Sequence, residues 1–292
     1  MEKTKKVQGI HGPGSTHWVG DGFHVRNMFP SNGLEDELNP FLMLDYAGPT
    51  YYKPTSQPQG VDEHPHRGFE TVTIAYQGSL EHRDSAGNSG TIRPGDVQWM
   101  TAASGVVHEE KHEREFIKKG GIQEMIQLWV NLPKAYKMSK PRYQTLLKEE
   151  IPLAAIGQSG GSSLRVIAGK WNGIVGPAKT FTPVNLYDIQ LKAGDAAEVN
   201  LTAGYSSAVL LLKGDVSLNS SQSLQGEAKL ALLETEGERV SIEAKEDSVL
   251  LVLNGEPIRE PVASYCPFVM NTQDEIRQAV EDYRAWRMGH LR

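Results

Sequence analysis

The sequence predicts an all-β protein of two similar domains, followed by a single helix near the C-terminus. Short runs rich in Val, Ile, Thr, Tyr and Leu precede glycine-containing turns, as at Thr71–Tyr76 and Ala208–Leu212, and this alternation is typical of strands. A weak internal repeat points to duplication, because Arg93-Pro-Gly-Asp96 is echoed by Lys192-Ala-Gly-Asp195. The two halves therefore look like copies of one β domain.

The length of the chain also favours two domains, since 292 residues exceed the usual size of a single core. The stretch 157–163 is polar and rich in glycine and serine, as in flexible connections. We therefore predict a first domain over residues 1–148, a linker over 149–163, and a second domain over 164–292 that carries the C-terminal helix.

The last predicted element is a helix over residues 272–286. Thr272 is suited to cap its N-terminus and Glu275 stands at the N3 position, which together make a capping box. Apolar residues then recur at helical spacing at Ile276, Ala279, Val280 and Tyr283. We expect this face to pack on one of the β domains.

Two short segments offer four side chains of the kind that bind metals. In an extended strand, His64 and His66 point to one face, and His108 and Glu110 likewise share a face. Two imidazoles separated by one residue can close onto a single ion. Pro65 lacks a backbone donor, which favours an edge strand or a barrel mouth. The sequence therefore predicts a metal site at an opening.

The nature of the donors narrows the choice of metal. Three imidazoles and one carboxylate leave two positions of an octahedron open, an arrangement in which non-haem Fe(II) binds a substrate oxygen and O₂ side by side. Zn, Ni, Mn and Cu are alternatives, because these donors suit them as well. A closed structural zinc site would normally use thiolates, and Cys266 is the single cysteine.

The remaining histidines are predicted to lie outside this site. His112 is expected to be exposed, although its parity also allows it to substitute for a ligand, and His82 is expected in a surface hairpin. The second domain has no histidine before the tail residue His290, so we expect it to be metal-free. Loop positions are predicted for His11, His17 and His24.

A few further side chains are assigned to the interior. Cys266, between Tyr265 and Pro267, is expected to be packed as a small hydrophobe. Trp99, Met100 and Trp129 stand at β spacing and are most simply core residues. Their alternative role is to line a pocket, because aromatic and Met side chains often surround a bound planar ligand.

The spacing around the first histidine pair extends the pattern. From Gly60 to Gly78 it runs G-x3-H-x-H-x3-E-x7-G, with Glu70 as the acid, and this resembles the first motif of the cupin superfamily. The turn at Pro94-Gly95, followed by His108, resembles the second cupin motif. Longer segments resemble the pirin family over nearly the whole chain, namely HPHRGFETVTIAYQGSLEHRD, RPGDVQWMTAASGVVHEE, IQLWVNLP, GEPIREPV and PFVMNT.

The resemblance to pirins implies two cupin barrels of the jelly-roll type in tandem. It also implies one Fe(II) in the N-terminal barrel, held by His64, His66, His108 and Glu110. Ordinary cupins use the acid at Glu70 instead, so two carboxylates compete for one coordination position. Both stay candidates for the catalytic group that accepts a proton from the substrate. Members known as quercetinases imply a small planar aromatic substrate such as quercetin, opened by 2,3-dioxygenation with O₂ and release of carbon monoxide.

The same resemblance supports a second hypothesis, since pirins also resemble transcriptional cofactors and modulators of metabolic enzymes. The protein would then be an iron-dependent regulator that binds a transcription factor or metabolic enzyme without turnover. A net charge of −6 argues against direct nucleic-acid binding. No run approaches the roughly twenty apolar residues of a membrane span. We expect a cytoplasmic protein, or a nuclear one if it is eukaryotic, without membrane contact.

Overall fold

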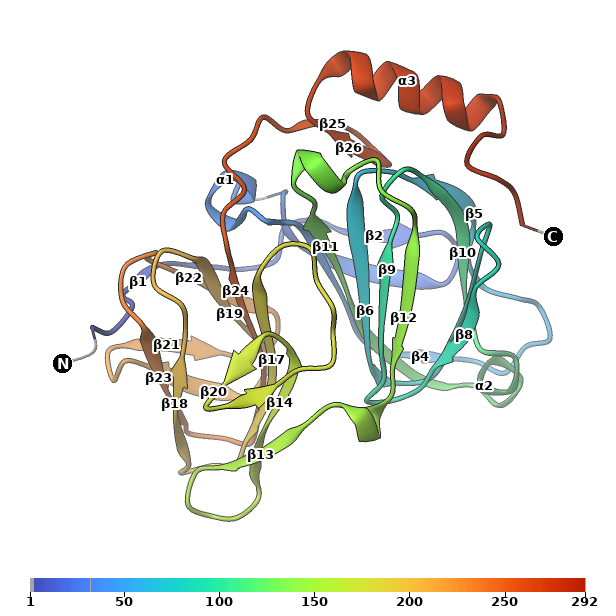
Figure 1. Cartoon of the computed structure of the whole chain (residues 1–292). Helices are drawn as coiled ribbons and strands as arrows, with labels where there is room; N and C mark the ends of the chain where they lie inside the picture. Colours follow the sequence, from blue (N-terminus) through green and yellow to red (C-terminus); the bar gives the residue numbers. More distant parts are fainter. Residues whose placement is uncertain (1–2, 32, 292) are drawn as a thin grey trace. The chain divides into compact units, whose positions relative to one another are not determined.

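The computed structural model describes residues 3–31 and 33–291 (Figure 1). The chain divides into two compact units, each assembled from separate stretches. The unit called here the first barrel is made of Ser15–Asn27, Phe41–Lys148 and Ile258–Arg292. The second barrel is made of Met1–Gly14, Met28–Pro40 and Glu149–Pro257. The all-β prediction is confirmed.

The structure differs from the predicted domain limits at both ends of the chain. The N-terminal strand β1 (Val7–His11) pairs with β22 (Lys229–Leu233) of the second barrel, and the residues from Ile258 onward belong to the first. The predicted linker contains β13 (Leu153–Ile156) and the start of β14 (Ser162–Ala168), which pair with each other. Pairing between strands far apart in sequence decides these memberships, and the local composition of a segment does not report it.

The first barrel has two antiparallel sheets. The larger sheet has the order β12-β9-β6-β11-β4-β3-β2 and the smaller one β5-β10-β7-β8. The bounds of the larger sheet are β2 (Thr16–Val19), β3 (Phe23–Phe29), β4 (Phe41–Tyr52), β6 (Phe69–Gln77), β9 (Val97–Thr101), β11 (Gly121–Asn131) and β12 (Arg142–Leu146). Those of the smaller sheet are β5 (Gly60–His66), β7 (Leu80–Asp84), β8 (Ser89–Ile92) and β10 (Val106–His112).

The second barrel repeats this plan with its own two sheets. The larger sheet has the order β1-β22-β19-β24-β17-β14-β13 and the smaller one β18-β23-β20-β21. The bounds of the larger sheet are β1 (Val7–His11), β13 (Leu153–Ile156), β14 (Ser162–Ala168), β17 (Val184–Leu191), β19 (Ser206–Lys213), β22 (Lys229–Leu233) and β24 (Ser248–Gly255). Those of the smaller sheet are β18 (Ala196–Asn200), β20 (Asp215–Leu218), β21 (Gln222–Gln225) and β23 (Arg239–Ala244).

A few short elements complete the chain. Their bounds are α1 (Glu35–Leu38), α2 (Arg114–Lys119), η1 (Lys134–Tyr136), η2 (Lys148–Glu150), β15 (Lys170–Trp171), β16 (Ile174–Val175), β25 (Ala263–Tyr265), β26 (Phe268–Met270) and α3 (Gln273–Arg284). Among the described residues, no helix has the length and apolar character needed to cross a membrane.

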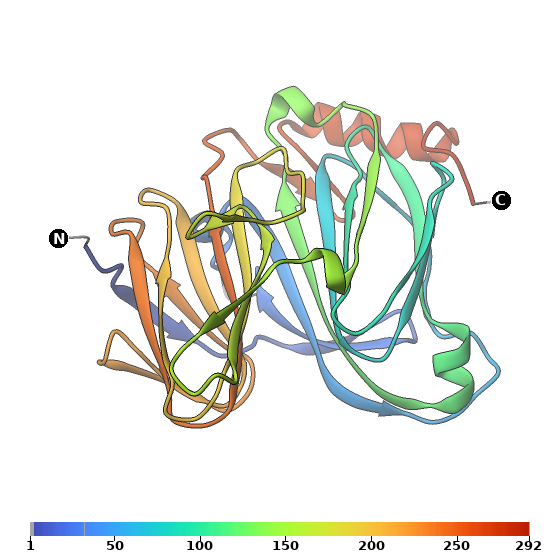
Figure 2. The same cartoon turned by 60° about the horizontal axis from the view of Figure 1, so that its bottom comes forward.

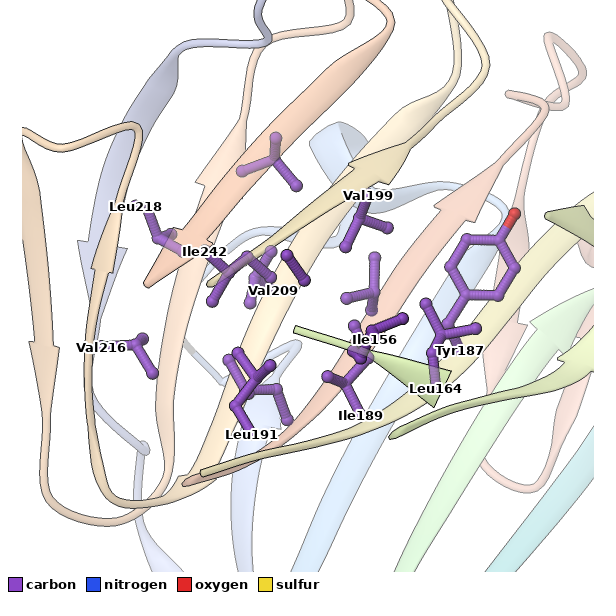
Figure 3. Packing of buried hydrophobic residues seen from close by; sticks show 14 of the residues in the cluster. Ile156, Leu164, Tyr187, Ile189, Leu191, Val199, Val209, Val216, Leu218 and Ile242 are labelled. Atoms are coloured by element: carbon purple, nitrogen blue, oxygen red, sulfur yellow. The ribbon is translucent and has the colours of Figure 1, made fainter. Parts of the chain in front are cut away.

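The interior of the second barrel is apolar. Tyr187 and Ile189 from β17 meet Val209 from β19, and Leu218 and Ile242 come from the smaller sheet (Figure 3). Inward positions recur with the two-residue period of a strand, so both sheets direct branched side chains into one core. Because burial of such side chains stabilises a fold by about 1.5–3 kcal/mol each, this apolar cluster is a main source of the stability of the second barrel.

The C-terminal helix α3 lies at one end of the first barrel, beside the β25–β26 hairpin (Figures 1 and 2). The predicted capping box is confirmed, because the Thr272 side chain accepts from the Glu275 amide and the Glu275 side chain accepts from the Thr272 amide. Ile276 and Ala279 are buried in a cluster that includes Val107 of β10. The predicted packing face is confirmed for Ile276, Ala279 and Val280, whereas Tyr283 is exposed. The face covers the strand that carries His108.

Candidate metal centre

The three predicted histidine ligands come together in the first barrel. His64 and His66 lie on β5, the edge strand of the smaller sheet, where Pro65 is tolerated. The next strand, β10, places His108 directly opposite His64. Ring centroids lie 4.2 Å apart for His64 and His108, and 4.8 Å apart for each of the other two pairs. The ligand nitrogens of all three lie within 4.8 Å of one another.

Hydrogen bonds fix which nitrogen two of these imidazoles present. The Nδ1 of His64 lies 2.7 Å from the carbonyl oxygen of Asp62, and the Nδ1 of His66 lies 3.3 Å from that of Pro267. A carbonyl oxygen only accepts, so both Nδ1 atoms donate and both Nε2 atoms keep their lone pairs. This is the state in which an imidazole coordinates a metal through Nε2.

His108 is the most enclosed of the three. Its side chain is fully buried, and its Nε2 has no hydrogen-bond partner among the described residues. Burial lowers the pKa of both His66 and His108 well below the usual value, and the neighbouring histidines lower it further. Both rings are therefore neutral at neutral pH. A neutral, buried and unpartnered imidazole nitrogen fits a divalent transition metal.

Glu110 lies beside these three histidines, His64, His66 and His108, which are called here the metal triangle. Its Oε1 accepts a hydrogen bond from the Thr73 hydroxyl at 3.2 Å. The extra residue of the irregular β10–β5 pairing lies in β5, between Val61 and His64, whereas β10 pairs regularly with β7, so Glu110 keeps the same face as His108. Glu110 forms a second group of close potential ligands with His108 and His82, and His108 belongs to both groups.

The structure places Glu70 on the other face of β6. Thr73 points toward Glu110, whereas Glu70 shares its face with Val72 and Ile74, because side chains alternate along a strand. Glu70 is fully buried there, and its Oε1 accepts from the Thr101 hydroxyl at 2.6 Å. Desolvation raises the pKa of Glu70 to about 7. A role for Glu70 as ligand or base at the histidine centre does not fit this position.

His82 is buried, which overturns the prediction of a surface position. It lies on β7, opposite Glu110 of β10, and its ring stacks on Tyr143 with centroids 4.8 Å apart. Its Nε2 lies 3.4 Å from Oδ2 of Asp84. The segment Leu80–Asp84 alternates buried and less buried positions, so a strand with His82 on the inner face could have been read from Leu80.

The other histidines also differ from their predicted positions. His112 is buried rather than exposed, because its Nε2 donates to the carbonyl oxygen of Gly22 at 2.8 Å and its ring packs between Phe23 and Tyr52. The three histidines assigned to loops all lie in strands, namely His11 in β1, His17 in β2 and His24 in β3. Cys266, which was predicted to be packed, is exposed.

An aromatic pair lies against the metal triangle. The rings of Phe69 and Trp129 lie 4.3 Å apart, and both contact His66, at 5.0 and 5.3 Å between centroids. Phe69 is buried and Trp129 is half-buried. The predicted core positions of Trp99 and Met100 are confirmed. Trp129 instead lies beside the histidines, in agreement with the alternative role as a pocket-lining residue.

Comparisons with known proteins agree with these features. The pirin family profile matches residues 22–130, and that of the pirin C-terminal cupin domain matches residues 186–289. A Pseudomonas aeruginosa protein named "Putative quercetin 2,3-dioxygenase" is 51% identical over 283 residues, which cover 97% of this chain and 98% of the relative. Pirin of Homo sapiens is 37% identical over 278 residues, which cover 94% and 90%.

A solved structure gives the same result in three dimensions. The crystal structure of quercetin 2,3-dioxygenase from Acinetobacter baumannii matches with a TM-score of 0.95 at 47% identity, over 99% of this chain and 100% of that one. The predicted pair of cupin barrels is thereby confirmed. These matches, together with the two barrels and the histidine group, show that the chain belongs to the pirin family.

Proposed function

We propose that this protein is a non-haem Fe(II)-dependent dioxygenase that opens the ring of a flavonol-like substrate such as quercetin. The observation that carries the proposal is the convergence of His64, His66 and His108, with the unpartnered Nε2 of His108 buried among them. Relatives named for quercetin 2,3-dioxygenase activity, at 51% and 47% identity, support the substrate class.

The proposed ligands are His64, His66, His108 and Glu110. Bound Fe(II) would supply adjacent coordination positions for a substrate oxygen and for O₂. The donors are hard or borderline and include no thiolate, which also suits Zn, Ni, Mn or Cu. A rotation of the Glu110 side chain toward the triangle would complete the set, since Glu110 already lies close to His108.

The aromatic pair Phe69 and Trp129 would orient the substrate. Both rings contact His66, so a planar ligand bound through an oxygen at the metal would lie against an apolar wall. Stacking of this kind excludes water from the reacting ring and holds it in one plane. The half-buried Trp129 is the member of the pair that is open to such contact.

Glu110 is the proposed proton acceptor. One of its oxygens accepts from Thr73, which leaves the second oxygen to bind metal or to take the proton of the substrate 3-hydroxyl. The Thr73 hydroxyl also lies 2.7 Å from Oε1 of Gln127, and because it carries one hydrogen it donates to one of these two oxygens at a time. Glu70 takes no part in this scheme, because its side chain lies on the opposite face of β6.

The test is turnover by protein loaded with Fe(II) under anaerobic conditions and then exposed to O₂ and quercetin. We expect loss of the flavonol absorbance, consumption of O₂ and release of carbon monoxide, all abolished by a chelator and restored by Fe(II). Glu110→Gln should lower the rate strongly. His17→Ala, a change at an exposed residue of β2, should match the wild type. Iron-loaded protein that binds quercetin without consuming it would contradict the proposal and favour a regulatory role.

A further inference from the structure

The three histidines of the metal triangle differ in what holds their Nδ1 atoms. Those of His64 and His66 face backbone carbonyl oxygens, which can only accept. The Nδ1 of His108 faces the Nδ1 of His82 at 3.3 Å. An imidazole nitrogen either donates or accepts, so this contact alone does not decide where the proton of His108 lies. The metal-binding state of His108 depends on a further residue.

That residue is Asp84, which lies on the far side of His82. The Nε2 of His82 is 3.4 Å from Oδ2 of Asp84, and both side chains are buried. The carboxylate accepts, so Nε2 of His82 carries a hydrogen, and a ring with its one N–H at Nε2 offers Nδ1 as an acceptor. His108 must then donate from its own Nδ1, which leaves the lone pair on its buried Nε2.

The position of Asp84 is itself fixed. Its Oδ1 accepts from the backbone amides of Ala86 and Asn88, at 2.9 and 3.0 Å, and the Asn88 side chain donates to both of its oxygens. Burial alone would raise the pKa of Asp84, but hydrogen bonds from His82 and Asn88 outweigh it and keep the pKa low. Tyr143 packs against His82, the middle residue of the series Asp84, His82 and His108. Its ring stacks on that of His82 at an interplanar angle of 18°.

We propose that Asp84 is a positioning residue that acts through His82 to hold His108 as the tautomer with its lone pair on Nε2, directed at the metal triangle. The inference rests on the proposed function to the extent that His108 is a metal ligand. A carboxylate that orders a ligand through an intervening group typically changes metal affinity or activity about 10 to 100-fold when it is removed.

The decisive variant is Asp84→Asn, which has nearly the same shape but the opposite polarity at one atom. The amide oxygen should stay with the Ala86 and Asn88 amides, because only an oxygen can accept there. The amide nitrogen then donates to Nε2 of His82. This reverses the direction of two hydrogen bonds, the one between residue 84 and His82 and the one between His82 and His108. The proton of His108 then lies on Nε2, where a metal has to displace it.

The readout that needs no metal is the tautomer of His108 in the apo protein. Long-range ¹H–¹⁵N spectra of ¹⁵N-histidine-labelled protein distinguish the two tautomers, and the His108 signals are those that disappear in His108→Gln. We expect the Nδ1–H form in the wild type and the Nε2–H form in Asp84→Asn. Isothermal titration with Co²⁺ should show affinity lower by about 10 to 100-fold in that variant.

Two further variants separate tautomer control from simple damage. Asn88→Ala removes the two side-chain hydrogen bonds to Asp84 but leaves its carboxylate and the two backbone amides that bind it, so His108 should keep the wild-type tautomer, and any loss of Co²⁺ affinity should be smaller than in Asp84→Asn. His82→Leu removes the acceptor, and we expect one equivalent of Co²⁺ to bind more weakly.

The result that would overturn this inference differs from the result that would overturn the proposed function. An Asp84→Asn variant that retains the Nδ1–H form of His108 would overturn the inference. So would loss of the whole equivalent of Co²⁺ in His82→Leu, because His82 would then be a ligand rather than a link. A wild type that binds no Co²⁺, yet whose His108 tautomer switches in Asp84→Asn, would defeat the proposed function and leave the positioning chain intact.

Discussion

His64 on β5 and His108 on β10 stand directly opposite each other across an antiparallel pair, and their ring centroids lie 4.2 Å apart. Side chains alternate between the two faces of a sheet, so a slip of one residue in this register would turn His108 to the other face. β5 is the edge strand of its sheet and pairs with β10. The register of this single strand pair therefore assembles the candidate metal centre.

The first prediction concerns the ligands. His66→Ala and His108→Ala should each abolish stoichiometric metal binding, because either change removes one of three converging imidazoles. The fold should persist, since the strands on either side are held by apolar packing. Metal analysis after anaerobic loading, with circular dichroism for the fold, measures both effects. His17→Ala is the control, and a full equivalent of metal in either site variant would refute the ligand assignment.

The second prediction separates the two carboxylates. Glu110→Gln should weaken Fe(II) binding strongly, because a neutral amide is a poor ligand in place of an anion. Glu70→Gln should leave binding close to the wild type, since Glu70 faces Val72 and Thr101 rather than the histidines. Anaerobic isothermal titration of the two variants at the same pH ranks them. A larger loss for Glu70→Gln would restore the ordinary cupin arrangement.

The third prediction concerns stability and pH. The pKa of Glu70 rises from 4.5 to about 7 on folding, because the carboxyl group is buried. Between these pH values the folded state keeps a proton that the unfolded state has lost. Raising the pH through this window therefore lowers the free energy of unfolding, by about 3 kcal/mol in total.

Glu70→Gln has no ionisable side chain at that position, so its stability is the reference for that of the wild type. Urea unfolding of wild type and variant below pH 4.5 and above pH 7 should show the variant gaining stability relative to the wild type as the pH rises. A difference that stays constant over this range would mean that Glu70 remains ionised, with the nearby Arg142 as a compensating charge.

The fourth prediction concerns the attachment of α3. The buried Arg67 donates from Nη1 to Oδ2 of Asp282 at 2.8 Å and from Nε to the Ser104 carbonyl oxygen. Asp282→Asn leaves this guanidinium without its anionic partner, which should cost about 3 kcal/mol of stability. Faster hydrogen exchange in α3 would report the loss. Asp274→Asn, in an exposed ion pair of the same helix, is the control and should change little.

Many features of the fold and the site were readable from the sequence because they depend on local rules. The strand-forming run before the turn at Gly78, the edge position implied by Pro65 and the capping box at Thr272 each follow from near neighbours in the chain. The convergence of His64 and His66 on one site follows from the two-residue period of a strand. The motif spacing then identified the family.

Tertiary structure alone decided which polar residues became buried. Charged neighbours made His112 and His82 look like surface groups, yet the barrel closes over both and pairs them with Gly22 and Asp84. Sequence alternation allows a polar residue on an inner face but does not say what will satisfy it there, because the partner comes from another strand.

The sequence by itself determined the β class, the duplication and three converging histidines, since these rest on local periodicity and residue chemistry. Tertiary structure decided that Ile258 onward returns to the first barrel and that Glu70 lies on the opposite face of β6 from Glu110. It also decided the contact of Asp84 with His82 beside His108. These depend on strand register and on contacts between distant segments, which only the folded chain brings into hydrogen-bonding range.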